Sequence, residues 1–164
     1  MAQLRQYPDP VLRMRAYEVE ELDDDLRRLV ERMTVLMQEA NGVGLAANQV
    51  GVLRRVFVMR PEEEPVAVVN PVIASTGDER ETDEEGCLSM PAVLVPVERS
   101  VSVRLEGRDV QGGALTLELE GLAARVAQHE LDHLDGILIL DRTTKEARRE
   151  ALATLRAQPS LQRA

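Results

Sequence analysis

The chain has 164 residues, of which 44% are hydrophobic, 30% are charged and only 2% are aromatic. This length and composition suit a soluble globular protein and exclude a disordered, collagen-like or coiled-coil chain. The net charge of −9 disfavours nucleic-acid binding, sequence-specific or general, because an acidic surface repels the phosphate backbone. No apolar run is long enough to span a membrane, and the N-terminus lacks the pattern of a secretory signal. A single cysteine suits a reducing compartment, so we expect a cytoplasmic protein.

The first predicted element is a helix over residues 23–40, where apolar side chains recur at helical spacing after three aspartates. Residues 42–49 have the composition of a turn-rich loop. Residues 54–60 and 66–70 predict two strands of a hairpin, and the polar, acidic residues 75–86 indicate a loop or a sheet edge. Three further strands are predicted from their apolar pattern, at 93–97, 101–106 and 115–119.

The apolar pattern becomes helical at Leu122 and stays so to about Asp135, before Gly136. A short apolar run at 137–140 and a last helix at 143–157 follow. This order of elements predicts an α+β fold with antiparallel pairing, in one domain of residues 1–164. Its C-terminal part, from about residue 142 to 164, is a basic helix and tail with six basic and two acidic residues.

Both histidines of the chain lie in QHELDHLDG, at residues 128–136. His129 and His133 are four residues apart, so on a helix they share one face and are able to hold a single metal ion. Glu130 leaves the helix beside them and reaches a water molecule without being a ligand. The alternative is a helix with two surface histidines and a solvated glutamate. A catalytic metal needs a third protein ligand, which here must be a carboxylate or Cys87.

Cys87 lies in EEGCLSM, beside Gly86, where another backbone can approach closely. Two alternatives stay open for it: a small buried hydrophobic residue, or a nucleophile with a histidine partner. The segment GVGLAANQ at 42–49 imitates a dinucleotide-binding pattern, but it follows a helix rather than a strand, so we reject that interpretation. Gln49 in this segment offers an amide that could donate to a developing oxyanion, or it is a surface residue of a plain turn.

Together, these three segments resemble peptide deformylase. That family carries GxGxAAxQ, EGCLS and QHExDHxxG in this order, and the chain has GVGLAANQ at 42–49, EGCLS at 85–89 and QHELDHLDG at 128–136. The similarity in strand and helix pattern extends from about Tyr7 to Arg149. It implies antiparallel sheets packed around a central metal-binding HExxH helix, with N-terminal and C-terminal helices.

The resemblance also implies a metal centre. Cys87, His129 and His133 would bind one divalent ion, Fe²⁺ in the cell, which Zn²⁺, Ni²⁺ or Co²⁺ could replace in the purified protein. Glu130 would act as general acid and base. The oxyanion hole would consist of Gln49 and the backbone N–H of Leu88.

The implied reaction is hydrolysis of the N-formyl group from N-formylmethionyl nascent peptides, with release of formate. The peptide would bind as an added strand, and its first side chain would enter an apolar pocket. The residues implied for peptide and pocket are Val43, Gly44, Gly86, Leu122, Val126 and His129. Some family members dock to the ribosome through the C-terminal helix, so the basic helix here suggests the same partner, with a solvated helix as the alternative.

The sequence departs from the family pattern in two places. Family members often have arginines within about ten residues after EGCLS, one to assist the substrate backbone and one to support the site, but here none comes before Arg99. Arg125 and Asp83 also occupy positions near the pocket where apolar residues are common. Two alternative functions stay open: a general zinc endopeptidase with Asp141 or Glu146 as third ligand, and a non-catalytic metal-binding or ribosome-binding relative.

Overall fold

The computed structural model describes residues 3–158. Five of its strands form an antiparallel sheet in the order β1-β2-β3-β6-β7, and β4 pairs with β5 as a long antiparallel ribbon. The strands are β1 Gly44–Ala46, β2 Val56–Met59, β3 Val66–Thr76, β4 Arg80–Cys87, β5 Met90–Ser100, β6 Ser102–Arg108 and β7 Ala114–Glu120.

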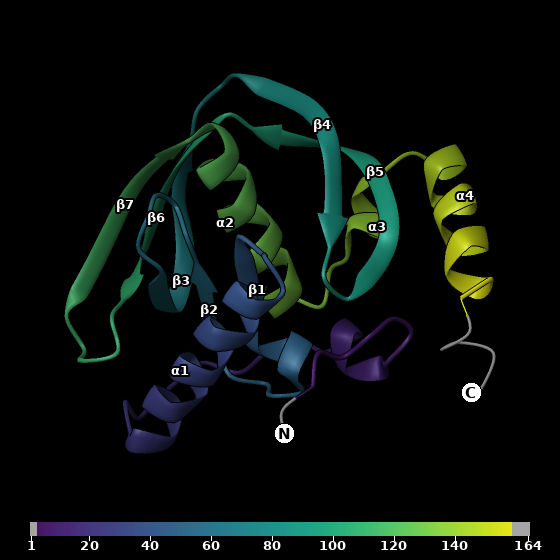
Figure 1. Ribbon diagram of the computed structural model, residues 1–164. Helices are drawn as coiled ribbons and strands as arrows, with labels where there is room; N and C mark the ends of the chain where they lie inside the picture. The colour runs from purple at the N-terminus through teal and green to yellow at the C-terminus, as the bar shows by residue number, and fades with distance from the viewer. Residues whose placement is uncertain (1–2, 159–164) are drawn as a thin grey trace.

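Four α-helices and two short 3₁₀ helices complete the fold. They are η1 Pro10–Arg13, α1 Asp24–Glu39, η2 Ala47–Val50, α2 Gly121–Leu134, α3 Ile139–Arg142 and α4 Lys145–Arg156. Helix α2 lies between the five-stranded sheet and the ribbon, while α3 and α4 lie on the outer side of the ribbon (Figure 1). The predicted α+β fold, with antiparallel sheets around the HExxH helix, is confirmed. Within residues 3–158, no helix has the length and apolar character needed to cross a membrane.

Helix α2 presents different chemistry to its two neighbours. Its small and apolar residues Ala124, Ala127 and Leu134 are fully buried in the cluster that includes Phe57 and Leu105 of the sheet. Residues 125, 129 and 133 recur every four positions, so they share another face of the helix, and this face meets the ribbon. The helix is thus anchored to the sheet by apolar packing and turns Arg125, His129 and His133 toward the ribbon.

The outer face of the ribbon is apolar. Met90, Val93, Val95 and Val97 of β5 are buried in one cluster with residues of the α3–α4 region, namely Leu138, Ile139, Leu140, Ala151 and Leu155. The ribbon is therefore held between a polar contact with α2 and an apolar contact with α3 and α4.

Helix α1 agrees with its prediction. The Asp23 side chain accepts a hydrogen bond of 2.8 Å from the backbone N–H of Leu26 and caps the helix. The apolar side chains buried by the helix are Leu26, Leu29, Met33 and Met37.

The structure corrects one local prediction and refines two others. Residues 42–49 are not a plain loop, because they contain strand β1 and most of η2; three residues are too few to show a strand period. The acidic segment predicted as a loop or a sheet edge contains β4, which has β5 as its partner, so the edge alternative is the correct one. Its sequence RETDEEGC shows no apolar alternation, because Glu85 is its only buried side chain. The strand predicted at 66–70 extends to Thr76.

Candidate active site

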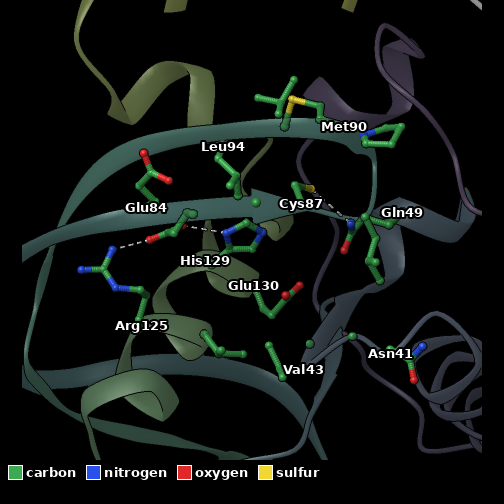
Figure 2. Close-up of a pocket in the computed structure, with 18 of the residues that line it drawn as sticks. Asn41, Val43, Gln49, Glu84, Cys87, Met90, Leu94, Arg125, His129 and Glu130 are labelled. Atoms are coloured by element: carbon green, nitrogen blue, oxygen red, sulfur yellow. Dashed lines mark hydrogen bonds and ion pairs between the residues drawn. The ribbon is translucent and has the colours of Figure 1, made fainter. Parts of the chain in front are cut away.

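Three side chains with metal-binding atoms converge where the end of β4 meets α2. Cys87 ends β4, and His129 and His133 lie one turn apart on α2. The Nε2 atoms of the two imidazoles are 3.1 Å apart, and the Cys87 Sγ lies 3.4 Å from Nε2 of His133. The three donor atoms all lie within 4.8 Å of one another. The structure thus brings together the three residues that the sequence indicates as metal ligands, and Figure 2 shows Cys87 beside His129.

The donor set fits a divalent transition-metal ion. Bonds of about 2.0–2.3 Å to a tetrahedral ion place neighbouring ligand atoms roughly 3.3–3.6 Å apart, which is close to the separations here. The Nδ1 atom of His129 lies 2.8 Å from the Glu85 Oε1, so its proton sits on Nδ1 and the lone pair on Nε2 faces the other two donors. Converging lone pairs repel one another unless a cation lies between them.

Glu85 fixes the orientation of His129. Besides His129, its Oε1 accepts from Arg99 Nη2 at 3.0 Å, and its Oε2 accepts from Arg99 Nε at 2.9 Å and from Arg125 Nη1 at 2.7 Å. Burial alone would raise the pKa of this carboxyl, but the hydrogen bonds from His129 and Arg99 hold the pKa well below its usual range. Glu85 is therefore ionised at neutral pH and keeps the proton on His129 Nδ1.

Arg99, the first arginine after EGCLS, supports the site. It is 5% exposed, forms the two hydrogen bonds to Glu85, and donates from Nη1 to Asp132 at 2.6 Å. Asp132 belongs to α2 and also accepts from Arg142. Within residues 90–97, where an arginine is often found in the family, the exposed Leu94 lines the cavity instead.

Glu130 lies on α2 between the histidines and is 4% exposed. Its Oε2 has no hydrogen-bond partner among the described residues. Gly44 of β1 packs directly on this carboxylate, because a Cβ at Gly44 would lie 2.5 Å from the Glu130 Oε1. Burial raises the pKa of Glu130 to about 7. The group is thus poised to hold or release a proton near neutral pH.

Gln49 is buried beside the cysteine with a fixed amide orientation. Its Oε1 accepts from the backbone N–H of Ala46 at 2.9 Å. Its Nε2 therefore faces the other way, 3.1 Å from the Ser89 Oγ and 3.6 Å from the Cys87 Sγ. The alternative of a surface glutamine in a plain turn is wrong, since the side chain is 1% exposed.

A cavity of about 480 Å³ opens in front of these groups. Leu88 lines it together with Gln49, Cys87, His129 and Glu130, and Figure 2 labels the last four of these, whereas His133 is buried and does not line it. All the residues implied for peptide and pocket line it as well: Val43, Gly44, Gly86, Leu122 and Val126.

The two side chains noted as departures near the pocket behave differently. Arg125 does line the cavity, but its guanidinium is engaged with Glu85 and with backbone carbonyls of the ribbon. Asp83 does not line it; it borders a separate, smaller cavity of about 100 Å³ that also includes Leu122 and Arg125. The position near the pocket that the resemblance implies for Asp83 is therefore not supported.

Comparison with known proteins agrees with this geometry. The sequence profile described as Polypeptide deformylase matches residues 1–149. The chain belongs to this family. The peptide deformylase of Thermotoga maritima is 47% identical over 148 residues, which is 90% of each chain, and peptide deformylase 1 of Corynebacterium efficiens is 46% identical over 158 residues, 94% of each.

Solved deformylase structures have the same fold. The crystal structure of peptide deformylase from Thermotoga maritima superposes with a TM-score of 0.85 at 48% identity, covering 88% of this chain and 98% of that one. The peptide deformylase from Legionella pneumophila gives a TM-score of 0.92 at 36% identity, covering 99% and 98%. Polypeptide deformylases are metal-dependent hydrolases that remove the formyl group from nascent peptides, and the family assignment favours this reaction over that of a general zinc endopeptidase.

The sequence interpretation missed the supporting residues around Glu85. Glu85 and Asp132 lie inside the motifs EGCLS and QHELDH, so their positions were a usable signal. Arg99 lies 12 residues after Cys87, and only the pairing of β4 with β5 brings it back beside Glu85.

Proposed function

We propose that the protein is a metal-dependent hydrolase that removes the N-formyl group from the N-terminal methionine of newly made polypeptides and releases formate. One observation carries the proposal: three metal-binding donors converge beside a single cavity, which a buried carboxylate and a buried carboxamide also line. Membership of the deformylase family supports the same reaction.

In this proposal Cys87, His129 and His133 hold one divalent ion, which is Fe²⁺ in the cell. A thiolate with two imidazoles also suits Zn²⁺, Ni²⁺ and Co²⁺, which can replace iron in the purified protein. The ion supplies Lewis-acid activation, which brings the pKa of a water molecule down toward neutrality. Exposure to air should inactivate an iron protein, and Ni²⁺ or Co²⁺ should restore its activity. Full activity after exposure to air would contradict the assignment of iron.

Glu130 moves the proton. Its carboxylate takes a proton from the attacking water and returns it to the nitrogen that leaves as the free amine. The pKa of about 7 that burial gives this group suits both steps. The Oε2 atom has no hydrogen-bond partner among the described residues, so its lone pair can accept the proton.

Gln49 and Leu88 stabilise the oxygen of the formyl group as it becomes negative. Gln49 donates from Nε2, whose direction is set by the hydrogen bond that Oε1 accepts from Ala46. Leu88 donates from its backbone N–H. Each donor of this kind is worth about 2.7–4 kcal/mol of transition-state stabilisation.

The peptide binds in an extended conformation. Strand β1 is at the edge of its sheet, so Gly44 offers its backbone groups on the side away from β2, whereas the Val43 carbonyl accepts from the Arg60 N–H. Val43 also lines the cavity, and Gly86 lies on its opposite wall. The first side chain enters between Val43, Leu122 and Val126, which give this part of the cavity an apolar lining for methionine, with His129 at its border.

The deciding experiment compares a short peptide that begins with formylmethionine with the same peptide without the formyl group. We expect formate and a free N-terminal amine from the first peptide and no cleavage of the second. Cleavage of internal peptide bonds without formate would favour the endopeptidase alternative. Metal binding without any product would favour a non-catalytic relative.

We also propose that helix α4 contacts the ribosome. Lys145, Arg149 and Arg156 are exposed and form no ion pair among the described residues, while Arg142 is engaged by Asp132. Such a basic surface on an acidic protein is attracted to ribosomal RNA. Arg163 of the predicted tail lies outside the described residues. Because nascent chains are made on ribosomes, we propose that the protein acts in the cytoplasm.

Truncation is a poor test of ribosome binding, because removal of α4 would expose the apolar face of the ribbon that carries Cys87. A triple charge reversal of the three exposed basic residues to glutamate keeps the helix in place. We expect less of this variant than of the parent to pellet with ribosomes, with formate release from short peptides unchanged. Equal pelleting would reject the interaction.

A further inference from the structure

Arg125 is a charged residue in an unexpected place. It lies on α2 one turn before His129, is 9% exposed, and forms part of the cavity wall. A buried guanidinium is retained only where several acceptors satisfy it. Its partners therefore indicate what it does.

The guanidinium of Arg125 joins α2 to both strands of the ribbon. Nη1 donates to the Glu85 Oε2 at 2.7 Å and to the backbone carbonyl of Val97 at 2.8 Å. Nη2 donates to the backbone carbonyl of Glu81 at 2.8 Å. Glu81 and Glu85 belong to β4 and Val97 to β5, so a single side chain holds both strands against the helix. Figure 2 labels Arg125 and marks one of its contacts with a dashed line.

The proposed metal ligands are divided between the two elements that Arg125 joins. Cys87 ends the ribbon strand β4, and both histidines lie on α2. Polar groups hold this interface together: the Gln128 side chain bonds to the backbone N–H and carbonyl of Ser100, at 3.1 and 2.9 Å. Hydrogen bonds are directional, so the loss of one changes the relative placement of the elements as well as their adhesion.

We propose that Arg125 is a positioning residue for the metal ligands. It holds the Glu85 carboxylate against His129 and clamps the ribbon onto α2, and so sets the separation between the Cys87 sulfur and the two imidazoles. The inference rests on the proposed function only in that these three residues bind the ion. Two simpler roles make different predictions: a residue that only shapes the cavity would affect KM, and one that only stabilises the fold would affect the melting temperature.

The test uses Arg125→Met and Arg125→Lys in the full chain loaded with Zn²⁺. Methionine keeps an unbranched apolar stem without hydrogen-bond donors. Lysine keeps the positive charge, but its compact ammonium group cannot reach all three acceptors at once. One control is Arg54→Met, which removes an arginine bound to the Asp23 carboxylate and the Glu21 carbonyl away from the cavity. The other is Leu29→Ala, a truncation in the core of α1 that lowers stability without touching the ribbon.

The measurement is the rate of Zn²⁺ loss to excess chelator, together with the melting temperature and the kinetics of formate release. We expect Arg125→Met to lose Zn²⁺ about 10–100-fold faster than the parent, as is typical when the partner of a metal ligand is disturbed. The rate of Zn²⁺ loss from Arg125→Lys should lie between those of the parent and of Arg125→Met. In Arg125→Met, kcat should fall while KM stays close to the parent value. Both controls should lose Zn²⁺ at the parent rate despite a lower melting temperature.

A rate of Zn²⁺ loss in Arg125→Met equal to that of the controls would overturn the inference, whether or not KM rises. If the methionine variant does not fold, the same comparison with Arg125→Lys decides. If the parent releases no formate but Arg125→Met still loses Zn²⁺ faster than the controls, the proposed function is refuted and the role of Arg125 stands.

Discussion

The addition of a single methyl group at Gly44 should damage catalysis strongly. A Cβ at this position would lie 2.5 Å from the Glu130 Oε1, 2.9 Å from its Cδ and 2.8 Å from the Val126 Cγ1. A carbon atom prefers about 3.5 Å from a neighbouring heavy atom, so in Gly44→Ala the carboxylate must move by roughly 1 Å. A misplacement of that size in a reacting group costs on the order of 10²-fold in rate. Overpacking should also cost about 1–3 kcal/mol of unfolding free energy.

The assay for Gly44→Ala is formate release, with metal content and urea unfolding measured on the same sample. Metal content should stay at the parent level, because the donor atoms are not touched. Gly86→Ala adds the same methyl group on the opposite wall, where the Cβ would meet the flexible end of Leu94 at 3.1 Å and the Val93 carbonyl oxygen at 3.6 Å. Because it does not touch Glu130, it should change KM for the peptide rather than kcat. Combining Gly44→Ala with Val126→Ala removes one contact but not those with Glu130, so it should not restore the rate. Parent-level kcat in Gly44→Ala, or recovery in the double variant, would refute this reasoning.

Three further predictions concern the buried polar groups. Glu130→Gln should keep its metal and its fold but lose about 10²–10⁴ in kcat, and full turnover would remove the acid–base role. Gln49→Ala should lower kcat by about 10²–10³ with little change in metal content, and a change in KM alone would argue against an oxyanion donor. The pKa of Glu85 lies below its usual value of 4.5, so its ionised form stabilises the fold above that pH and this stabilisation is lost as the pH falls. Glu85→Gln should therefore cost about 3–5 kcal/mol at neutral pH, and this deficit, followed by urea unfolding, should shrink below about pH 4.5; a deficit independent of pH would contradict the assignment.

The candidate metal ligands and the candidate catalytic residues could be proposed from the sequence because their chemistry is local. Two histidines four apart fix a shared helix face wherever the helix lies, and α1 and α2 appear in the sequence as long amphipathic patterns. The resemblance in three motifs was then enough to connect Cys87 and Gln49 with that face, and the family assignment is confirmed.

The remaining features depend on tertiary contacts that no local pattern encodes. Strand β4 carries acidic residues where an apolar alternation would be expected, because its one buried side chain, Glu85, faces arginines rather than a hydrophobic core. Arg99 is remote from Glu85 in the sequence, and only the pairing of β4 with β5 brings the two side chains into contact. Arg125 looked like an intrusion into an apolar pocket, whereas its guanidinium points to the ribbon.

The central claim is that Cys87, His129 and His133 hold one metal ion that the reaction needs. The most direct test is metal analysis of protein purified without oxygen, run beside the formate assay on the parent and on Cys87→Ala. The account predicts one ion per chain and rapid formate release in the parent, and loss of both in the variant. Undiminished metal content in Cys87→Ala, or parent-level formate release without metal, would contradict it.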